Sequence, residues 1–204
     1  MTPVASTPTP ARAGATPWAA NAALPWQYDI FAGWIVNGTD VWNYSVVHDR
    51  DVKQAGAASA RVQCVVPKKG EFGGIMQTIA ADAFRGKRVR FSAFVRTRDV
   101  VGWVGLWMRV DRPNDRGSAF DNMQNRAIKG TTDWTSYAVV LDVAADAVTL
   151  NYGLLLANGA GTAWLDNATV EIVNASVPVT NMTAQGTGTT RGRPKAPVNL
   201  DLDN

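Results

Sequence analysis

Residues 88–97 read RVRFSAFVRT and residues 102–111 read GWVGLWMRVD, and both segments alternate between two kinds of side chain. Successive side chains of a β-strand point to opposite sides, so a period of two indicates extended strands. One face of the first segment is apolar and consists of Val89, Phe91, Ala93 and Val95. In the second segment the apolar face consists of Val104, Leu106, Met108 and Val110. The two segments therefore predict strands that cover one side of a buried core.

The same period recurs along most of the chain and is interrupted by Gly, Pro, Asn and Asp at intervals typical of β-sandwiches. Strands are predicted at residues 28–34, 42–48, 59–66, 73–79, 88–97, 103–111, 118–123, 136–142, 149–157 and 163–173. One helical turn is predicted at residues 80–84, closed by Gly86. The expected fold is all-β, an antiparallel jelly-roll β-sandwich with an irregular tail at each end.

The length and composition predict one folded domain between two tails. A chain of 204 residues is long enough for one well-buried core. Residues 1–24 are rich in Ala, Thr and Pro and predict a disordered or docking tail, whereas residues 177–204 form a Thr/Gly/Pro-rich tail. The sandwich domain is then expected at residues 25–176. No secretion signal or membrane-length apolar segment is recognised, so we expect a soluble, cytoplasmic protein that does not associate with membranes.

Several classes of enzyme are disfavoured by the residues that the chain lacks. Cys64 is the only cysteine and lies among valines, which predicts a buried structural thiol and excludes an intrachain disulfide. His48 is the only histidine, so a multi-histidine metal site cannot form and a Ser-His-Asp triad has little material. The segment GEFGGI is not followed by a helix, which disfavours nucleotide binding. The net charge of +3 requires no polyanionic partner.

The order of AASARVQ, GGIMQTI, GKRVRFSAFVRT, GWVGLWMRVD, TTDWTSYAVVLDV and LNYGLLLANGAGTAWLDNATVEIV resembles the galactose-binding-like β-sandwiches of many carbohydrate-binding modules. More specifically, residues 72–173 resemble an uncharacterised ligand-binding-type domain that bacteria append to transcriptional regulators, including the AraC type. The chain shows no helix-turn-helix pattern, which weakens a transcription-factor role. In the modules a structural calcium often uses an acidic residue of the last hairpin. Asp166 matches that position, with Asp29 or Asp40 as the nearest partner, and no other cofactor is expected.

The second face of residues 103–109 suggests a ligand site. Trp103 and Trp107 provide two aromatic platforms there and Arg109 provides a charged donor. The next segment, AFDNMQNRAIKG, supplies a polar rim of Asp121, Asn122, Gln124 and Arg126. Two alternatives stay open. The tryptophans could instead pack beneath the N-terminal tail or a loop, and the rim residues could satisfy their own backbone.

Three functions are compatible with these patterns. The first is a small-molecule or carbohydrate-binding module that uses a concave aromatic face. The second is a small stand-alone enzyme of the cyclase, isomerase or lyase type, with an apolar pocket and Asp121 or His48 as acid/base group. The third is an assembly protein, and so a homo-oligomer, whose tails dock on neighbouring subunits.

A short motif in the second tail points to a further partner. Residues 191–195, RGRPK, resemble an AT-hook, in which Arg191 and Arg193 would enter the minor groove of A·T-rich DNA. Apart from this motif no nucleic-acid partner is expected.

Overall fold

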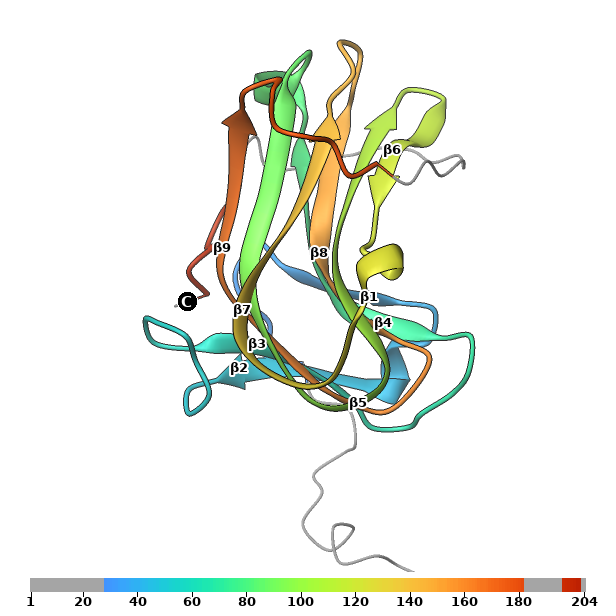
Figure 1. Ribbon diagram of the computed structural model, residues 1–204, viewed down its shortest axis with the longest axis vertical. Coiled ribbons are helices and arrows are strands. Elements are labelled where there is room, and N and C mark those ends of the chain that lie inside the picture. The colour runs from blue at the N-terminus through green and yellow to red at the C-terminus, as the bar shows by residue number, and fades with distance from the viewer. Residues whose placement is uncertain (1–27, 182–195, 203–204) are drawn as a thin grey trace, which may run out of the picture.

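The computed structural model describes residues 28–181 and 196–202 (Figure 1). This part of the chain contains nine strands, all paired antiparallel, and three short 3₁₀ helices. The strands are β1 (Ile35–Gly38), β2 (Tyr44–Asp49), β3 (Ser59–Cys64), β4 (Phe72–Ala80), β5 (Arg88–Arg112), β6 (Asp115–Asp121), β7 (Ile128–Asp142), β8 (Thr149–Ala157) and β9 (Gly161–Val173). The 3₁₀ helices are η2 (Val41–Asn43), η3 (Asp82–Phe84) and η4 (Gln124–Arg126).

Strand β5 belongs to both layers of the sandwich. Its first part pairs with β7 and β9, and β9 continues through β3 to β2. Its second part pairs with β6 and β8, and β8 continues through β4 to β1. Register shifts between Val95 and Val104 interrupt the pairing with β7 where the strands curve from one layer to the other (Figure 1). The architecture is the predicted antiparallel jelly-roll β-sandwich.

The predicted alternation of β5 is confirmed by the core. All the side chains expected to face inward on this strand are at most 1% exposed: Val89, Phe91, Ala93, Val95, Val104, Leu106, Met108 and Val110. Cys64 is buried as predicted, and its burial raises the pKa of the thiol. The ring of Tyr44 lies flat on Gly73, where a Cβ would be only 2.2 Å from it. The packing is therefore tight enough to require a residue without a side chain at that point.

Two strand predictions were wrong in detail. Residues 28–34 form only an isolated bridge from Tyr28 to Val46 and then a turn in which Gly33 has a φ of +82°. The first strand begins at Ile35, because its backbone finds a partner on β4. The segments 88–97 and 103–111 are one continuous strand and not two. The predicted helical turn is present as η3, and Gly86 follows it with a φ of +67°.

Residues 196–202, which we call the strap, pack against the end of the sandwich beside β9 (Figure 1). The Ala168 backbone N–H donates to the Leu200 carbonyl at 2.9 Å, and Trp34 Nε1 donates to the Asn199 carbonyl at 3.1 Å. The Leu202 side chain is fully buried. This part of the predicted C-terminal tail is irregular and docked on the domain. Within residues 28–181 and 196–202, no helix has the length and apolar character needed to cross a membrane.

Candidate functional site

The outer side of the layer formed by β4, β8, the second part of β5, and β6 carries an apolar patch, which we call the aromatic face. Its centre is Trp107, which is 5% exposed, together with Leu155 and Ala157. Partly buried side chains from β4, β5 and β6 surround this centre: Phe72, Met76, Trp103 and Phe120. The antiparallel register sets these side chains in rows across the strands. Trp103 and Trp107 were both predicted from the sequence, and the structure brings them into one cluster.

Two glycines beside the tryptophans allow a close approach of neighbouring backbone. Gly153 lies in register between Trp107 on β5 and Met76 on β4. Gly105 lies on β5 between the two tryptophans, where a Cβ would come within 2.3 Å of the Asn122 carbonyl oxygen. A Cβ at Gly153 would come within 2.0 Å of the neighbouring strand. No larger residue fits without moving the backbone, so the floor of the aromatic face stays low next to Trp107.

A polar network borders the aromatic face. Arg109 Nε and Nη2 donate to the two carboxylate oxygens of Asp111 at 2.8 and 3.1 Å. Asn151 Nδ2 donates to Asp111 Oδ2 at 2.9 Å, and Asn151 Oδ1 accepts from Thr78 Oγ1 at 2.8 Å. The guanidinium and the carboxylate neutralise one another, so the border offers planar donors and acceptors without a net charge. Arg109, also predicted from the sequence, thus lies where an aromatic surface meets a polar one.

The indole nitrogen of Trp107 is buried and has no hydrogen-bond partner within the described part of the chain. A buried N–H without an acceptor costs about 1–3 kcal/mol, and buried tryptophans usually find one. Because the N–H is covered by its surroundings, a ligand oxygen reaches it only after the covering groups move. The rings that the aromatic face presents to a ligand are therefore the partly buried ones of Phe72, Trp103 and Phe120, which can stack against an apolar ring.

Comparison with known proteins finds one similar regulator. The chain is 40% identical over 155 residues to the uncharacterized HTH-type transcriptional regulator YbfP of Bacillus subtilis (strain 168). The match covers 76% of this chain and 52% of that protein, so the chain spans about half the length of the curated relative it matches. No protein-family model matches the sequence.

Solved structures show the same fold at low sequence identity. The CBM22-1 xylan-binding domain from Paenibacillus barcinonensis superposes with a TM-score of 0.52, at 17% identity over 74% of this chain and 92% of that one. A Clostridium thermocellum xylanase containing a CBM22-1 module, complexed with xylohexaose, also gives 0.52, at 13% identity over 74% of this chain and 28% of the other. The tailspike protein 4 of bacteriophage CBA120 gives 0.56, at 17% identity, covering 72% and 20%. The chain has the jelly-roll fold of carbohydrate-binding modules.

The predicted polar rim is satisfied within itself. Asp121 is fully buried on the core side of β6, opposite Met108, and does not reach the aromatic face. Its carboxylate accepts from Arg126 Nη1 and Nη2 at 3.1 and 2.5 Å and from the Met123 backbone N–H at 2.8 Å. Asn122 Oδ1 accepts the backbone N–H of Gln124 at 3.1 Å. The structure therefore favours the alternative in which these residues hold their own loop together.

The remaining predicted residues lie away from the aromatic face. His48 Nδ1 is 3.0 Å from Asp29 Oδ2, and its ring centroid is 3.6 Å from that of Phe31. Asp166 is fully buried, and its Oδ2 accepts the backbone N–H groups of residues 54 and 55 at 2.6 and 3.1 Å. Between residues 28 and 181 and along the strap, no group of three or more His, Cys, Asp or Glu side chains is placed to hold a metal. Calcium at Asp166 stays a prediction.

Arg191 and Arg193 lie outside the described residues. The AT-hook prediction is therefore not addressed by the structure.

Several members of the site were missed by the sequence reasoning. Phe72, Met76 and Leu155 complete the aromatic face, and Thr78, Asn151 and Asp111 complete its border. The period of two in FGGIMQTIA, TLNYGLLLA and GWVGLWMRVD places each of them on a face opposite the core. That signal was present, but only the register of β4, β8 and β5 shows that their outer sides form one surface.

Proposed function

We propose that this chain is a non-catalytic binding module whose aromatic face takes a carbohydrate. The observation that carries the proposal is Trp107, whose buried indole N–H has no acceptor among the described residues while its ring lies at the centre of an apolar platform. A pyranose has an apolar face that stacks on aromatic rings and equatorial oxygens that accept hydrogen bonds. One molecule of this class would use both properties of Trp107.

The charge of the site favours a neutral glycan. Arg109 and Asp111, the charged outward residues of β4, β8 and the second part of β5, are paired at 2.8 Å, and the exposed Arg116 on β6 lies opposite Asp111 at the end of the layer. An acidic sugar would have to compete with Asp111 for the guanidinium. The xylose backbone of xylan and xylohexaose are uncharged, and both glycans are named for proteins that share this fold. Xylohexaose is therefore the first probe to use.

The likeness to YbfP supports a second, more specific proposal. A 40% identical sequence occupies about half of an HTH-type transcriptional regulator, so we infer that the module can act as the ligand-sensing part of such a protein. The AraC type rests on the resemblance of residues 72–173 alone. In that arrangement the glycan would be a signal and not a substrate. A xylohexaose-dependent change in operator binding by YbfP, lost when the residue aligned with Trp107 is replaced, would support this role. Unchanged operator binding would contradict it.

The experiment that tests the binding proposal is calorimetric titration of the full chain with xylohexaose, galactotriose and glucuronic acid. The variant Trp107→Phe keeps an aromatic ring and removes only the N–H donor, so we expect affinity for the neutral glycan to fall about threefold to tenfold. Trp107→Ala removes the platform as well and should abolish measurable binding. Trp42→Ala is the matched control, because Trp42 is 59% exposed and belongs to η2, away from the aromatic face.

The free protein provides a second readout. Trp107→Phe loses packing contacts, which destabilises the fold, but it also removes a buried N–H that has no acceptor, which stabilises it. The two effects partly cancel, so the free energy of unfolding should change by less than about 1 kcal/mol. Weakened glycan binding with nearly unchanged stability is the expected pair of results. A large loss of stability with unaltered binding would mean that Trp107 only packs.

A further inference from the structure

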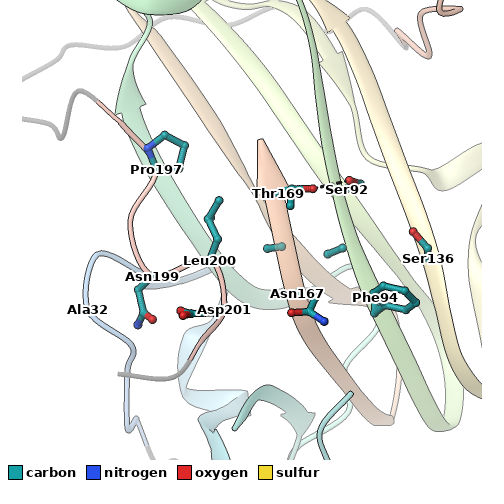
Figure 2. A pocket seen from close by; sticks show the side chains of 12 residues that line it. Ala32, Ser92, Phe94, Ser136, Asn167, Thr169, Pro197, Asn199, Leu200 and Asp201 are labelled. Atoms are coloured by element: carbon teal, nitrogen blue, oxygen red, sulfur yellow. Dashed lines mark hydrogen bonds between the residues drawn. The ribbon is translucent and has the colours of Figure 1, made fainter. Parts of the chain in front are cut away.

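A concave region lies on the layer opposite the aromatic face, over β9 (Figure 2). It is a cavity of about 830 Å³ between the strap and the outer sides of β5, β7 and β9, and we call it the strap cavity. Figure 2 shows Asn199 and Asp201 of the strap on one side of β9, and Ser92, Phe94 and Ser136 on the other. The volume falls in the range of roughly 300–1,000 Å³ that is usual for small-molecule sites.

Local backbone irregularity opens this cavity. The pairing of β5 with β9 shifts register between Ser92 and Phe94, and Asn167 on β9 has a φ of +47°. Such a bulge turns the flanking side chains out of the regular ladder. The next residue, Ala168, gives its backbone N–H to the strap, which fixes the strap as one wall. The bulge and the docked strap together create the concavity.

The lining chemistry is rich in hydroxyl and amide groups and has one charge. Ser92 Oγ and Thr169 Oγ1 lie 2.8 Å apart and share one hydrogen bond, which leaves one hydroxyl hydrogen available. Phe94 supplies an apolar surface across from Ser136. Among the described residues, Asp201 is the one ionisable member of the lining, and no cationic side chain of this part of the chain lies within 4.0 Å of its carboxylate. The cavity thus suits a ligand with several hydroxyl groups and a positive charge.

We propose that the strap cavity is a second ligand site, distinct from the aromatic face, that takes a small polyhydroxylated amine such as an amino sugar. Asp201 pairs with the ammonium group, Ser92, Ser136 and Thr169 contact the hydroxyl groups, and Phe94 packs against the apolar face of the ring. Neutral sugars bind more weakly, because they leave the carboxylate unpaired, and acidic sugars are repelled.

Binding at this site is coupled to docking of the strap. The strap contributes Pro197, Asn199, Leu200 and Asp201 to the lining, so the complete site exists only while the strap is docked. A ligand that binds only the docked state must shift the equilibrium toward it. Ligand binding should therefore slow hydrogen exchange of strap amides such as that of Leu202, which donates to the Asn199 carbonyl.

The test is titration of the full chain with protonated glucosamine, glucose and glucuronic acid, read by calorimetry and by hydrogen exchange of the strap. Asp201 is exposed, so its charge-assisted contact is screened by solvent, and Asp201→Asn should weaken glucosamine about twofold to fivefold and leave glucose unchanged. Asp133→Asn is the matched control, since Asp133 is an 88% exposed carboxylate on β7 outside the cavity. Ser136→Trp keeps a strand-compatible residue at an exposed position and should block the cavity.

Two results would overturn the proposal. One is equal affinity of glucosamine for the wild type and for Asp201→Asn. The other is binding that leaves strap exchange unaltered. Trp107→Phe should leave glucosamine binding intact, so failure of this site and failure of the aromatic face are told apart.

Discussion

Removal of Arg126 should destabilise the fold and leave ligand binding intact. The Asp121 carboxylate is fully buried, and its only cationic partner among the described residues is Arg126, through two hydrogen bonds of 3.1 and 2.5 Å. Removing one partner of a buried ion pair costs about 3–5 kcal/mol, because the other charge is left buried. Water reaches Arg126, whose side chain is 34% exposed, so Arg126→Met should cost about 2–4 kcal/mol.

Urea denaturation of a double-mutant cycle measures this effect. Asp121→Asn should cost less than Arg126→Met, because an amide oxygen still accepts the Met123 N–H and the half-exposed guanidinium can be hydrated. The double variant should be less destabilised than the sum of the single ones, by at least about 1 kcal/mol. Xylohexaose and glucosamine titrations serve as the control. If Arg126→Met were within about 0.5 kcal/mol of the wild type and lost binding, the pair would belong to a ligand site and the present reasoning would fail.

Three further outcomes are expected. Gly73→Ala should lower the free energy of unfolding by about 1–3 kcal/mol in urea denaturation, because its Cβ would lie 2.2 Å from the Tyr44 ring. Leu202→Ala should cost about 2 kcal/mol and speed hydrogen exchange along the strap, since the side chain is fully buried. Burial raises the pKa of Asp49, but the indole N–H of Trp164, two backbone N–H groups and Arg61 outweigh it and hold the pKa below its usual range. Asp49 therefore stabilises the fold above its unfolded pKa of about 3.9, and this contribution is lost as the pH falls through the folded pKa. In urea denaturation, the free energy of unfolding should fall less steeply with decreasing pH for Asp49→Asn than for the wild type.

The fold could be predicted largely because β5 carries its information locally. Alternation along residues 88–97 and 102–111 of this strand is a property of the sequence, and it identified the inward side chains correctly. The sequence pattern did not show that the two segments form one continuous strand. That continuity depends on the curve near Val100, where the pairing of β5 passes from one layer to the other. The strand at Ile35 was missed for a similar reason. Its only regular partner lies on β4, about forty residues away, whereas Tyr28 to Trp34 imitates an alternating strand.

The site could be predicted only in part, for reasons of register. Trp103, Trp107 and Arg109 lie on one strand, so their common side follows from the period of two. Asp121 was expected beside them, but its position opposite Met108 turns it into the core. A shift of one residue in the pairing of β6 would have placed it outward. The strap cavity gave no sequence signal, because it needs a bulge in β9 and a contact with the C-terminal segment.

The two proposed sites lie on opposite layers, and the strap connects them through one buried residue. Gln77 on β4 accepts from the Tyr152 hydroxyl at 2.7 Å and from the Val198 backbone N–H at 3.3 Å, and its amide donates to the Val198 carbonyl. Its neighbours in the chain, Met76 and Thr78, belong to the aromatic face and its border. Undocking of the strap would leave the side-chain N–H of Gln77 without its acceptor, the Val198 carbonyl, which is costly because Gln77 is buried. The strap should thus stay docked in the free protein, and the two sites should bind independently while it does. If the affinity for xylohexaose changed when glucosamine was added, β4 itself would have to move when the strap cavity is filled, and the two sites would not be independent.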